Sequence, residues 1–206
     1  MPSPLSPTES PITHVLYLHG FRSSPQSTKA RQVAAVMAAK FPHITWWCPQ
    51  LPPSPQAATV LIAQGTAHWP AQSMAVIGSS LGGFYATWLA AHRDCKAVLL
   101  NPAINPARDL AKYIGEQTAW HDPAELFYFA PEFVDELRTL EIGTLPHPER
   151  AWVLIAKGDE VLDWREMTAR YPDSTQVVIE GGDHAISNFE SYLPHVLAFL
   201  NLQPAP

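Results

Sequence analysis

The sequence predicts an α/β fold in which a parallel six-stranded sheet is covered by helices on both faces. Short apolar runs alternate with longer helix-like segments along the 206 residues, which is typical of sheets built from βαβ units. Trp46 and Trp47 are neighbours in one expected strand, so their large side chains point to opposite faces, and both faces are expected to be covered. Right-handed crossovers and short connections then favour a three-layer α/β/α sandwich with strand order 2-1-3-4-5-6.

The individual elements follow from apolar runs and from helix start signals. The six expected strands are residues 13–18, 44–48, 74–78, 96–100, 151–156 and 175–179. The expected helices are residues 25–41, 57–68, 81–92 and 188–200. For the first of these, Ser24 is the expected N-cap and Pro25 the first helical residue.

The segment between the fourth and fifth strands, about residues 103–150, is too long for an ordinary connection. We expect it to form a small cap of one or two helices over the carboxyl edge of the sheet. Its aromatic side chains could form the core of the cap or line a substrate pocket; they are Tyr113, Trp120, Phe127, Tyr128, Phe129 and Phe133. The domain is expected to span residues 12–202, with a disordered tail at residues 1–11 and a short tail at 203–206.

Composition narrows the class of protein. A content of 47% hydrophobic and 16% charged residues indicates a globular domain. The net charge of −6 argues against nucleic acid or an anionic membrane as the main partner. Cys48 and Cys95 are expected to be buried free thiols of a reducing compartment. No signal peptide or membrane-length apolar stretch is recognised, and we expect a cytoplasmic protein that acts on a small molecule as a monomer or homodimer.

The motif Gly78-Ser79-Ser80-Leu81-Gly82 matches the G-x-S-x-G nucleophile elbow. In such an elbow the serine lies on a tight strand-to-helix turn, and the residues two before and two after it approach closely. Glycine at both places removes the Cβ clash, so the register selects Ser80 as the nucleophile. The expected strand before the motif and helix after it supply the required context.

A serine hydroxyl needs a base within hydrogen-bond reach to act as a nucleophile at neutral pH. We expect that base to be a histidine on the loop after the last strand. Gly181-Gly182-Asp183-His184 occupies this place, which makes His184 the candidate among nine histidines.

The third member of the triad orients the imidazole and stabilises its protonated form. Asp159 is the first carboxylate after the fifth strand and is favoured for this role. Asp163 is the competitor, although its place before Trp164 fits a helix N-cap better. The chain order Ser…Asp…His is the one expected for a G-x-S-x-G hydrolase.

An acyl-transfer site also needs donors for the developing oxyanion. The backbone N–H of Leu81, which follows the nucleophile, is one expected donor, and the N–H of Phe21 in the loop after the first strand is the other. We expect His19 to brace this loop by a hydrogen bond rather than to act as a base. Arg22 could meet an anionic leaving group, but a solvated surface charge is favoured.

With these residues placed, the chain resembles the α/β-hydrolase superfamily, and within it the small bacterial YqiA-type esterases. The resemblance extends over nearly the whole chain and rests on five segments: Tyr17-Leu18-His19-Gly20-Phe21 with Ser23-Ser24-Pro25-Gln26-Ser27, Gly78-Ser79-Ser80-Leu81-Gly82-Gly83-Phe84-Tyr85-Ala86, Asn101-Pro102-Ala103, Gly158-Asp159-Glu160-Val161-Leu162-Asp163, and Gly181-Gly182-Asp183-His184. It implies a minimal α/β-hydrolase fold without cofactor, and an esterase or thioesterase for fairly short acyl groups. It also carries the roles of nucleophile, acid and base onto Ser80, Asp159 and His184.

The leading hypothesis is therefore hydrolysis of a carboxylic ester or thioester through an acyl-enzyme on Ser80. The alternative is a binding protein that kept the fold and lost the chemistry, although every expected catalytic position is filled. Metal-assisted hydrolysis through Asp159, Glu160 and Asp163 is disfavoured because no H-E-x-x-H or paired-cysteine spacing is present, and we expect no metal.

Overall fold

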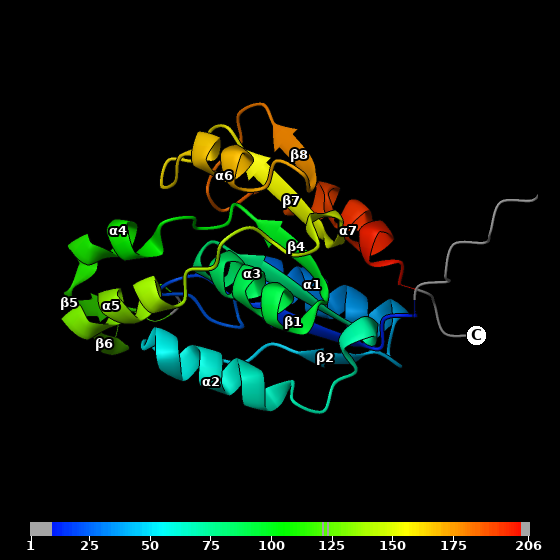
Figure 1. Cartoon of the computed structure of the whole chain (residues 1–206), viewed down its shortest axis with the longest axis horizontal. Coiled ribbons are helices and arrows are strands. Elements are labelled where there is room, and N and C mark those ends of the chain that lie inside the picture. The colour runs from blue at the N-terminus through cyan, green and yellow to red at the C-terminus, as the bar shows by residue number, and fades with distance from the viewer. Residues whose placement is uncertain (1–9, 121, 123, 203–206) are drawn as a thin grey trace, which may run out of the picture.

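The structure, a computed structural model, describes residues 10–120, 122 and 124–202. Its centre is a parallel sheet of six strands in the order β2-β1-β3-β4-β7-β8 (Figure 1). The strands are β1 (His14–Leu18), β2 (Thr45–Trp47), β3 (Met74–Ser79), β4 (Lys96–Leu100), β7 (Ala151–Ala156) and β8 (Thr175–Ile179). Since β7 and β8 are the fifth and sixth strands of this sheet, the predicted order is confirmed. The predicted tails at residues 1–9 and 203–206 lie outside the described residues.

Helices cover both faces of the sheet, as the sequence predicted. One buried cluster joins one sheet face to α2 (Pro55–Gly65), α3 (Leu81–Arg93) and α6 (Trp164–Arg170). The other joins the opposite face to α1 (Thr28–Lys40) and α7 (Leu193–Leu200). The strands β3, β4 and β7 are buried along their whole length, which explains their continuous apolar sequence.

The start of α1 differs from the prediction. The helix begins at Thr28 with Ser27 as its N-cap, so Ser24 and Pro25 lie in the preceding turn. Ser24 is buried, and its hydroxyl accepts a hydrogen bond from the N–H of Gln26 at 3.1 Å. This local turn uses the hydroxyl that a helix N-cap would have needed, which explains why the Ser-Pro signal misplaced the helix start.

The cap between β4 and β7 contains two short helices, α4 (Pro106–Leu110) and α5 (Pro131–Thr139), as expected. It also contains an antiparallel pair of strands that the expectation of a purely helical cap missed: β5 (Gly115–Thr118) and β6 (Leu126–Phe129). We call this pair the ribbon. Figure 1 shows α4, α5 and the ribbon gathered at one end of the molecule. Short 3₁₀ turns complete the described chain: η1 (Ala71–Ser73), η2 (Ala111–Tyr113), η3 (Pro148–Arg150) and η4 (Phe189–Ser191).

Candidate active site

Ser80 lies in the turn between β3 and α3 with φ 55° and ψ −121°, a conformation that a non-glycine residue rarely adopts. The turn is tight because both flanking glycines touch backbone. A Cβ on Gly82 would lie 2.0 Å from the carbonyl oxygen of Leu18, and one on Gly78 would lie 2.2 Å from that of Gly82. The glycine requirement argued from the motif is therefore present in the local geometry.

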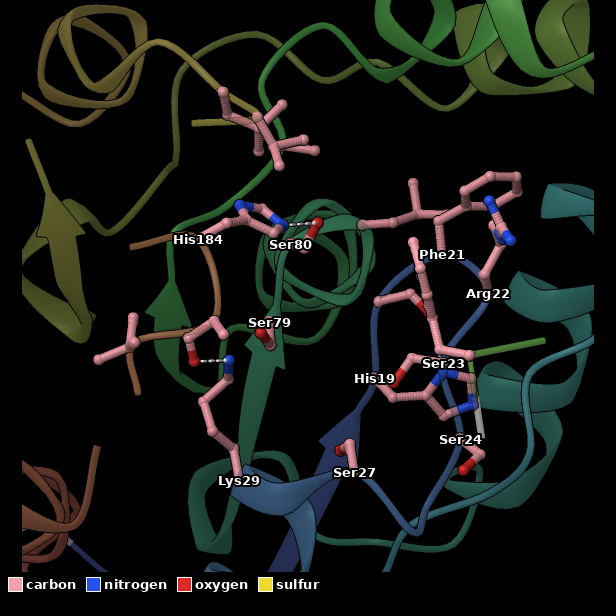
Figure 2. A pocket seen from close by; sticks show the side chains of 18 of the residues that line it. His19, Phe21, Arg22, Ser23, Ser24, Ser27, Lys29, Ser79, Ser80 and His184 are labelled. Atoms are coloured by element: carbon pink, nitrogen blue, oxygen red, sulfur yellow. Dashed lines mark hydrogen bonds between the residues drawn. The ribbon is translucent and has the colours of Figure 1, made fainter. Parts of the chain in front are cut away.

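The structure brings the three predicted triad residues together. The Nε2 atom of His184 lies 2.9 Å from the hydroxyl of Ser80 (Figure 2). Its Nδ1 atom lies 2.8 Å from Oδ2 of Asp159. An ionised carboxylate only accepts, so Nδ1 carries the ring proton and Nε2 accepts the hydroxyl hydrogen of Ser80. The Asp159 side chain is fully buried, while that of His184 is 21% exposed and can reach a bound molecule.

The loop after β7 holds Asp159 in place. Its second carboxylate oxygen, Oδ1, accepts hydrogen bonds from the N–H groups of Val161 and Leu162, both at 2.8 Å. Asp163 instead caps α6 by accepting from the N–H of Arg165 at 2.9 Å. This geometry separates the two candidates: Asp159 contacts His184 and Asp163 contacts the helix.

Two residues that the sequence did not assign a role hold the loop that carries His184. Glu160 accepts a hydrogen bond from the N–H of His184 at 3.0 Å. Asn101, fully buried at the end of β4, donates from its side chain to the carbonyl oxygens of Asp183 at 3.0 Å and His184 at 3.2 Å. Its Oδ1 accepts from the N–H of Ala156 at 2.8 Å. Asn101 therefore connects β4, β7 and the His184 loop. These contacts join residues that are distant in sequence, so no local sequence pattern predicts them.

The loop after β1 lies against the elbow. A Cβ on Gly20 would lie 3.2 Å from that of Ser80, so the backbone of this loop passes close to the serine. Neither the N–H of Phe21 nor that of Leu81 takes part in a hydrogen bond of the described residues, which leaves both available to a bound oxygen. His19 is buried, and its Nε2 accepts from the N–H of Leu51 at 3.0 Å, while Nδ1 lies 3.0 Å from the carbonyl oxygen of Gly20. It braces the loop, as predicted.

Arg22 is not a solvated surface charge, and on this point the prediction was wrong. Its guanidinium donates to the carbonyl and hydroxyl oxygens of Thr118 at 2.6 and 2.7 Å. It also stacks 4.2 Å from the ring centre of Trp120, and the backbone N–H of Trp120 donates to the Arg22 carbonyl at 2.7 Å. Arg22 thereby ties the loop of Phe21 to the ribbon.

A cavity of about 610 Å³ opens over Ser80 and His184. The cap aromatics divide between the two roles that the sequence left open. Tyr113 and Trp120 line this cavity, whereas Phe129 is buried against Phe21 and Phe133. Tyr128 does neither and is 61% exposed.

The comparisons with known proteins agree with this architecture. Residues 14–201 match the family described as "Uncharacterised protein family (UPF0227)". The chain belongs to this family. Members of the α/β-hydrolase superfamily share the fold: the mouse alpha/beta hydrolase domain-containing protein 10 superposes with a TM-score of 0.67 at 15% identity, over 91% of this chain and 90% of that one. At this identity the likeness shows that this UPF0227 chain has the α/β-hydrolase fold.

Two further solved structures are similar to this UPF0227 chain. A protein from Agrobacterium vitis S4 has a TM-score of 0.71 at 16% identity, with 93% of this chain and 91% of that one covered. Est1E from Butyrivibrio proteoclasticus, solved with ferulic acid bound, has a TM-score of 0.66 at 13% identity, with 91% and 87% covered. At these identities the likeness concerns the fold.

The described residues contain neither a metal-ligand cluster nor a membrane-spanning helix. No group of three or more His, Cys, Asp or Glu side chains gathers there in an arrangement that could hold a metal ion. Asp159 and Glu160 bind different nitrogen atoms of His184, and Asp163 caps α6. No helix in the described part of the chain combines the length and apolar character needed to cross a membrane.

Proposed function

We propose that this protein is a serine hydrolase that cleaves carboxylic ester or thioester bonds of small acyl substrates. The observation that carries the proposal is the hydrogen-bonded series Ser80–His184–Asp159, with 2.9 Å and 2.8 Å between the joined atoms, at the floor of a cavity. Such a series activates a serine hydroxyl for attack on a carbonyl carbon.

In the proposed reaction, His184 takes the proton of Ser80 as the hydroxyl oxygen attacks the acyl carbon. Asp159 holds His184 in the required tautomer and stabilises the imidazolium. The N–H groups of Leu81 and Phe21 would donate to the oxyanion of the tetrahedral intermediate. The protonated His184 then protonates the leaving alcohol or thiol, and water, activated in the same way, releases the acid from the acyl-enzyme.

The cavity supports a substrate of modest size. Its volume of about 610 Å³ lies within the range of small-molecule sites. Pro106, Leu110 and Tyr113 give one end an apolar lining that suits a fairly short acyl chain. The proposal covers both esters and thioesters. It also places the activity in the cytoplasm, because the free thiols of Cys48 and Cys95 fit a reducing compartment.

Labelling with a fluorophosphonate probe, read as intact mass, tests the proposal directly. The wild type should gain a single adduct, and Ser80→Ala should gain none while keeping its thermal stability. Ser191→Ala is the control, since this serine is exposed and lies outside the cavity, and it should still be labelled. Absence of an adduct on folded wild-type protein would contradict the proposal and favour the binding-protein alternative.

A further inference from the structure

A second, polar part of the cavity lies beside Ser80, on the α1 side of the sheet. Five residues define this polar chamber: Tyr17, Ser27, Lys29, Gln32 and Ser79, all of which line the cavity. Tyr17 and Ile77 are paired neighbours in β1 and β3, and both belong to the buried cluster that faces α1. Since strand side chains alternate, Ser79 points to the same face as Ile77. Figure 2 shows Ser79, Ser27 and Lys29 around this space, below Ser80.

Two buried polar atoms in the chamber lack a hydrogen-bond partner among the described residues. These are the hydroxyl of Tyr17, a residue that is 0% exposed, and Oε1 of Gln32. Burial raises the pKa of the Tyr17 phenol, and the nearby hydroxyls of Ser27 and Ser79 oppose this shift without forming a well-aligned bond to it. A buried hydroxyl that forms no bond is costly, so its persistence beside a reactive serine points to a ligand atom that it binds.

Lys29 gives the chamber a positive charge. Its ammonium donates to the carbonyl oxygen of Ala185, next to His184, and has two further N–H donors. The nearest carboxylates are committed elsewhere: Asp159 to His184, and Asp183 to the N–H and hydroxyl of Ser187. Among the described residues, no carboxylate forms an ion pair with Lys29.

The first turn of α1 adds to this positive potential. The first N–H groups of an α-helix have no partner within the helix, and the helix dipole is positive at that end. The side chain of Ser27, at the N-cap, makes no capping hydrogen bond, so its hydroxyl stays available to the chamber. A lysine, hydroxyl donors and a helix N-terminus together favour an anion.

The anion that fits carries a single charge. Besides Lys29, the Lys and Arg residues that line the cavity are Arg22 and Lys112. Arg22 is bound to Thr118, and Lys112 lies over the ring of Tyr113, 5.2 Å from its centre. The chamber therefore offers one ammonium group and no arginine that is free to bind two oxygens at once. This single positive charge suits a carboxylate better than a phosphate dianion.

We propose that the polar chamber binds a carboxylate group of the substrate, so that the preferred substrates are esters or thioesters that carry a free carboxylate in addition to the scissile bond. This inference rests on the proposed hydrolase function and names its substrate class. The carboxylate accepts hydrogen bonds from Lys29 and the hydroxyl of Tyr17, while the scissile carbonyl lies at Ser80.

The test compares substrate pairs that differ only in this charge. Mono-4-nitrophenyl adipate and its methyl ester place the carboxylate, or its neutral counterpart, on the acyl side. 4-Acetoxybenzoate and its methyl ester place it on the alcohol side. The measured quantity is the acid-to-methyl-ester ratio of kcat/KM at pH 7. We expect this ratio to exceed about 10 for one of the two pairs, because a charged carboxylate accepts stronger hydrogen bonds than its neutral ester. The pair that shows the preference identifies the side.

Three variants locate the preference in the chamber. Lys29→Met should lower the ratio at least about tenfold, and Tyr17→Phe should lower it about threefold or more, because it removes one hydroxyl donor. Lys40→Met is the matched control on the same helix, exposed and outside the cavity, and should keep the wild-type ratio. Tyr17→Phe removes a hydroxyl that forms no bond within the described protein, so it should fold normally.

The possible outcomes distinguish a failure of the carboxylate site from a failure of the proposed hydrolase function. If the fluorophosphonate probe labels Ser80 but the ratio is 1 or lower for both pairs, the carboxylate site is refuted and the hydrolase proposal stands. If Lys29→Met lowers kcat/KM equally for acid and methyl ester, Lys29 only supports the His184 loop, and the inference fails again. If the wild type is neither labelled nor active on any of the four esters, both the hydrolase proposal and this inference fail.

Discussion

The side-chain amide of Asn101 donates a hydrogen bond to the carbonyl oxygen of His184 across a distance of 3.2 Å. The two residues are far apart in sequence, and this bond attaches the loop of the candidate base to the end of β4. Asn101 adopts φ 41°, a left-handed conformation that asparagine tolerates better than most residues. Its backbone and its side chain therefore both suit this one position.

Asn101→Ala should reduce the free energy of unfolding by about 3 kcal/mol, because it leaves the buried N–H of Ala156 without an acceptor and places alanine at a positive φ. It should also lower kcat more than it raises KM, since the His184 loop loses its anchor. Denaturant unfolding and ester kinetics measure both effects. Asn188→Ala, an exposed asparagine near the same loop, is the control and should be neutral.

Asp159→Asn should lower kcat about 10³–10⁴-fold with little loss of stability, because an amide in this place favours the wrong imidazole tautomer. Asp163→Asn is the matched control, since asparagine also caps helices well, and its activity should stay within about twofold of wild type. The reverse ranking of the two variants in steady-state kinetics would contradict the assignment of Asp159.

Gly82→Ala should destabilise the fold by about 3 kcal/mol or more, because the new methyl group would meet the carbonyl oxygen of Leu18 at 2.0 Å. The backbone at Leu18 and Gly82 cannot move apart unless β1 or the elbow shifts. Gly143→Ala adds the same methyl group where nothing lies within 4 Å and should leave the melting temperature unchanged. Equal melting temperatures for the two variants would show that the elbow is not tightly packed.

The carboxylate preference should depend on pH through Lys29. Burial lowers the pKa of Lys29 to about 8, against the opposing effects of Asp183 and Asp159. The ammonium is therefore charged below pH 8 and neutral above it, and the acid-to-methyl-ester ratio should fall up to about tenfold between pH 7 and pH 9. The Tyr17 phenol stays neutral over this range because burial raises its pKa, so it does not contribute to the change. A ratio that stays constant over this range would exclude Lys29 as the ligand.

Arg22→Lys should loosen the ribbon, because lysine cannot reproduce the paired bonds to Thr118 or the stacking on Trp120. We expect faster amide hydrogen exchange in β5 and β6, and a KM about threefold to tenfold higher for an apolar ester. Arg165→Lys, at an exposed arginine stacked on Trp164, is the control and should change neither quantity.

Most of the sheet could be predicted from sequence because its strands are continuous apolar runs. The ribbon could not, since Gly115–Thr118 is polar apart from its glycine and lacks the alternation of a half-buried strand. It forms because Phe127 and Phe129 of its partner strand pack edge-on against the ring of Phe21. That contact joins segments about a hundred residues apart, and no local pattern encodes it.

The same distinction applies to the site. Ser80, Asp159 and His184 were predictable because each follows a recognisable strand, and the carboxyl ends of parallel strands share one edge of the sheet. Lys29 and Arg22 were not, because their surroundings depend on partners from the cap and from the loop after β8. A charged residue in a polar segment looks like a surface residue until its distant neighbours are known.

Arg22 is the residue after Phe21 and adopts φ 59°. Its side chain binds Thr118 of the ribbon, and its carbonyl oxygen accepts from the backbone N–H of Trp120 in the loop that joins β5 to β6. One residue therefore lines the cavity, follows Phe21 in the chain and contacts the ribbon. An engineer who lengthens the ribbon to admit bulkier acyl chains would also disturb the amide proposed to stabilise the oxyanion. If the proposed hydrolase function holds, substrate scope and turnover rate would have to be re-optimised together, with Arg22 and the ribbon redesigned as one unit.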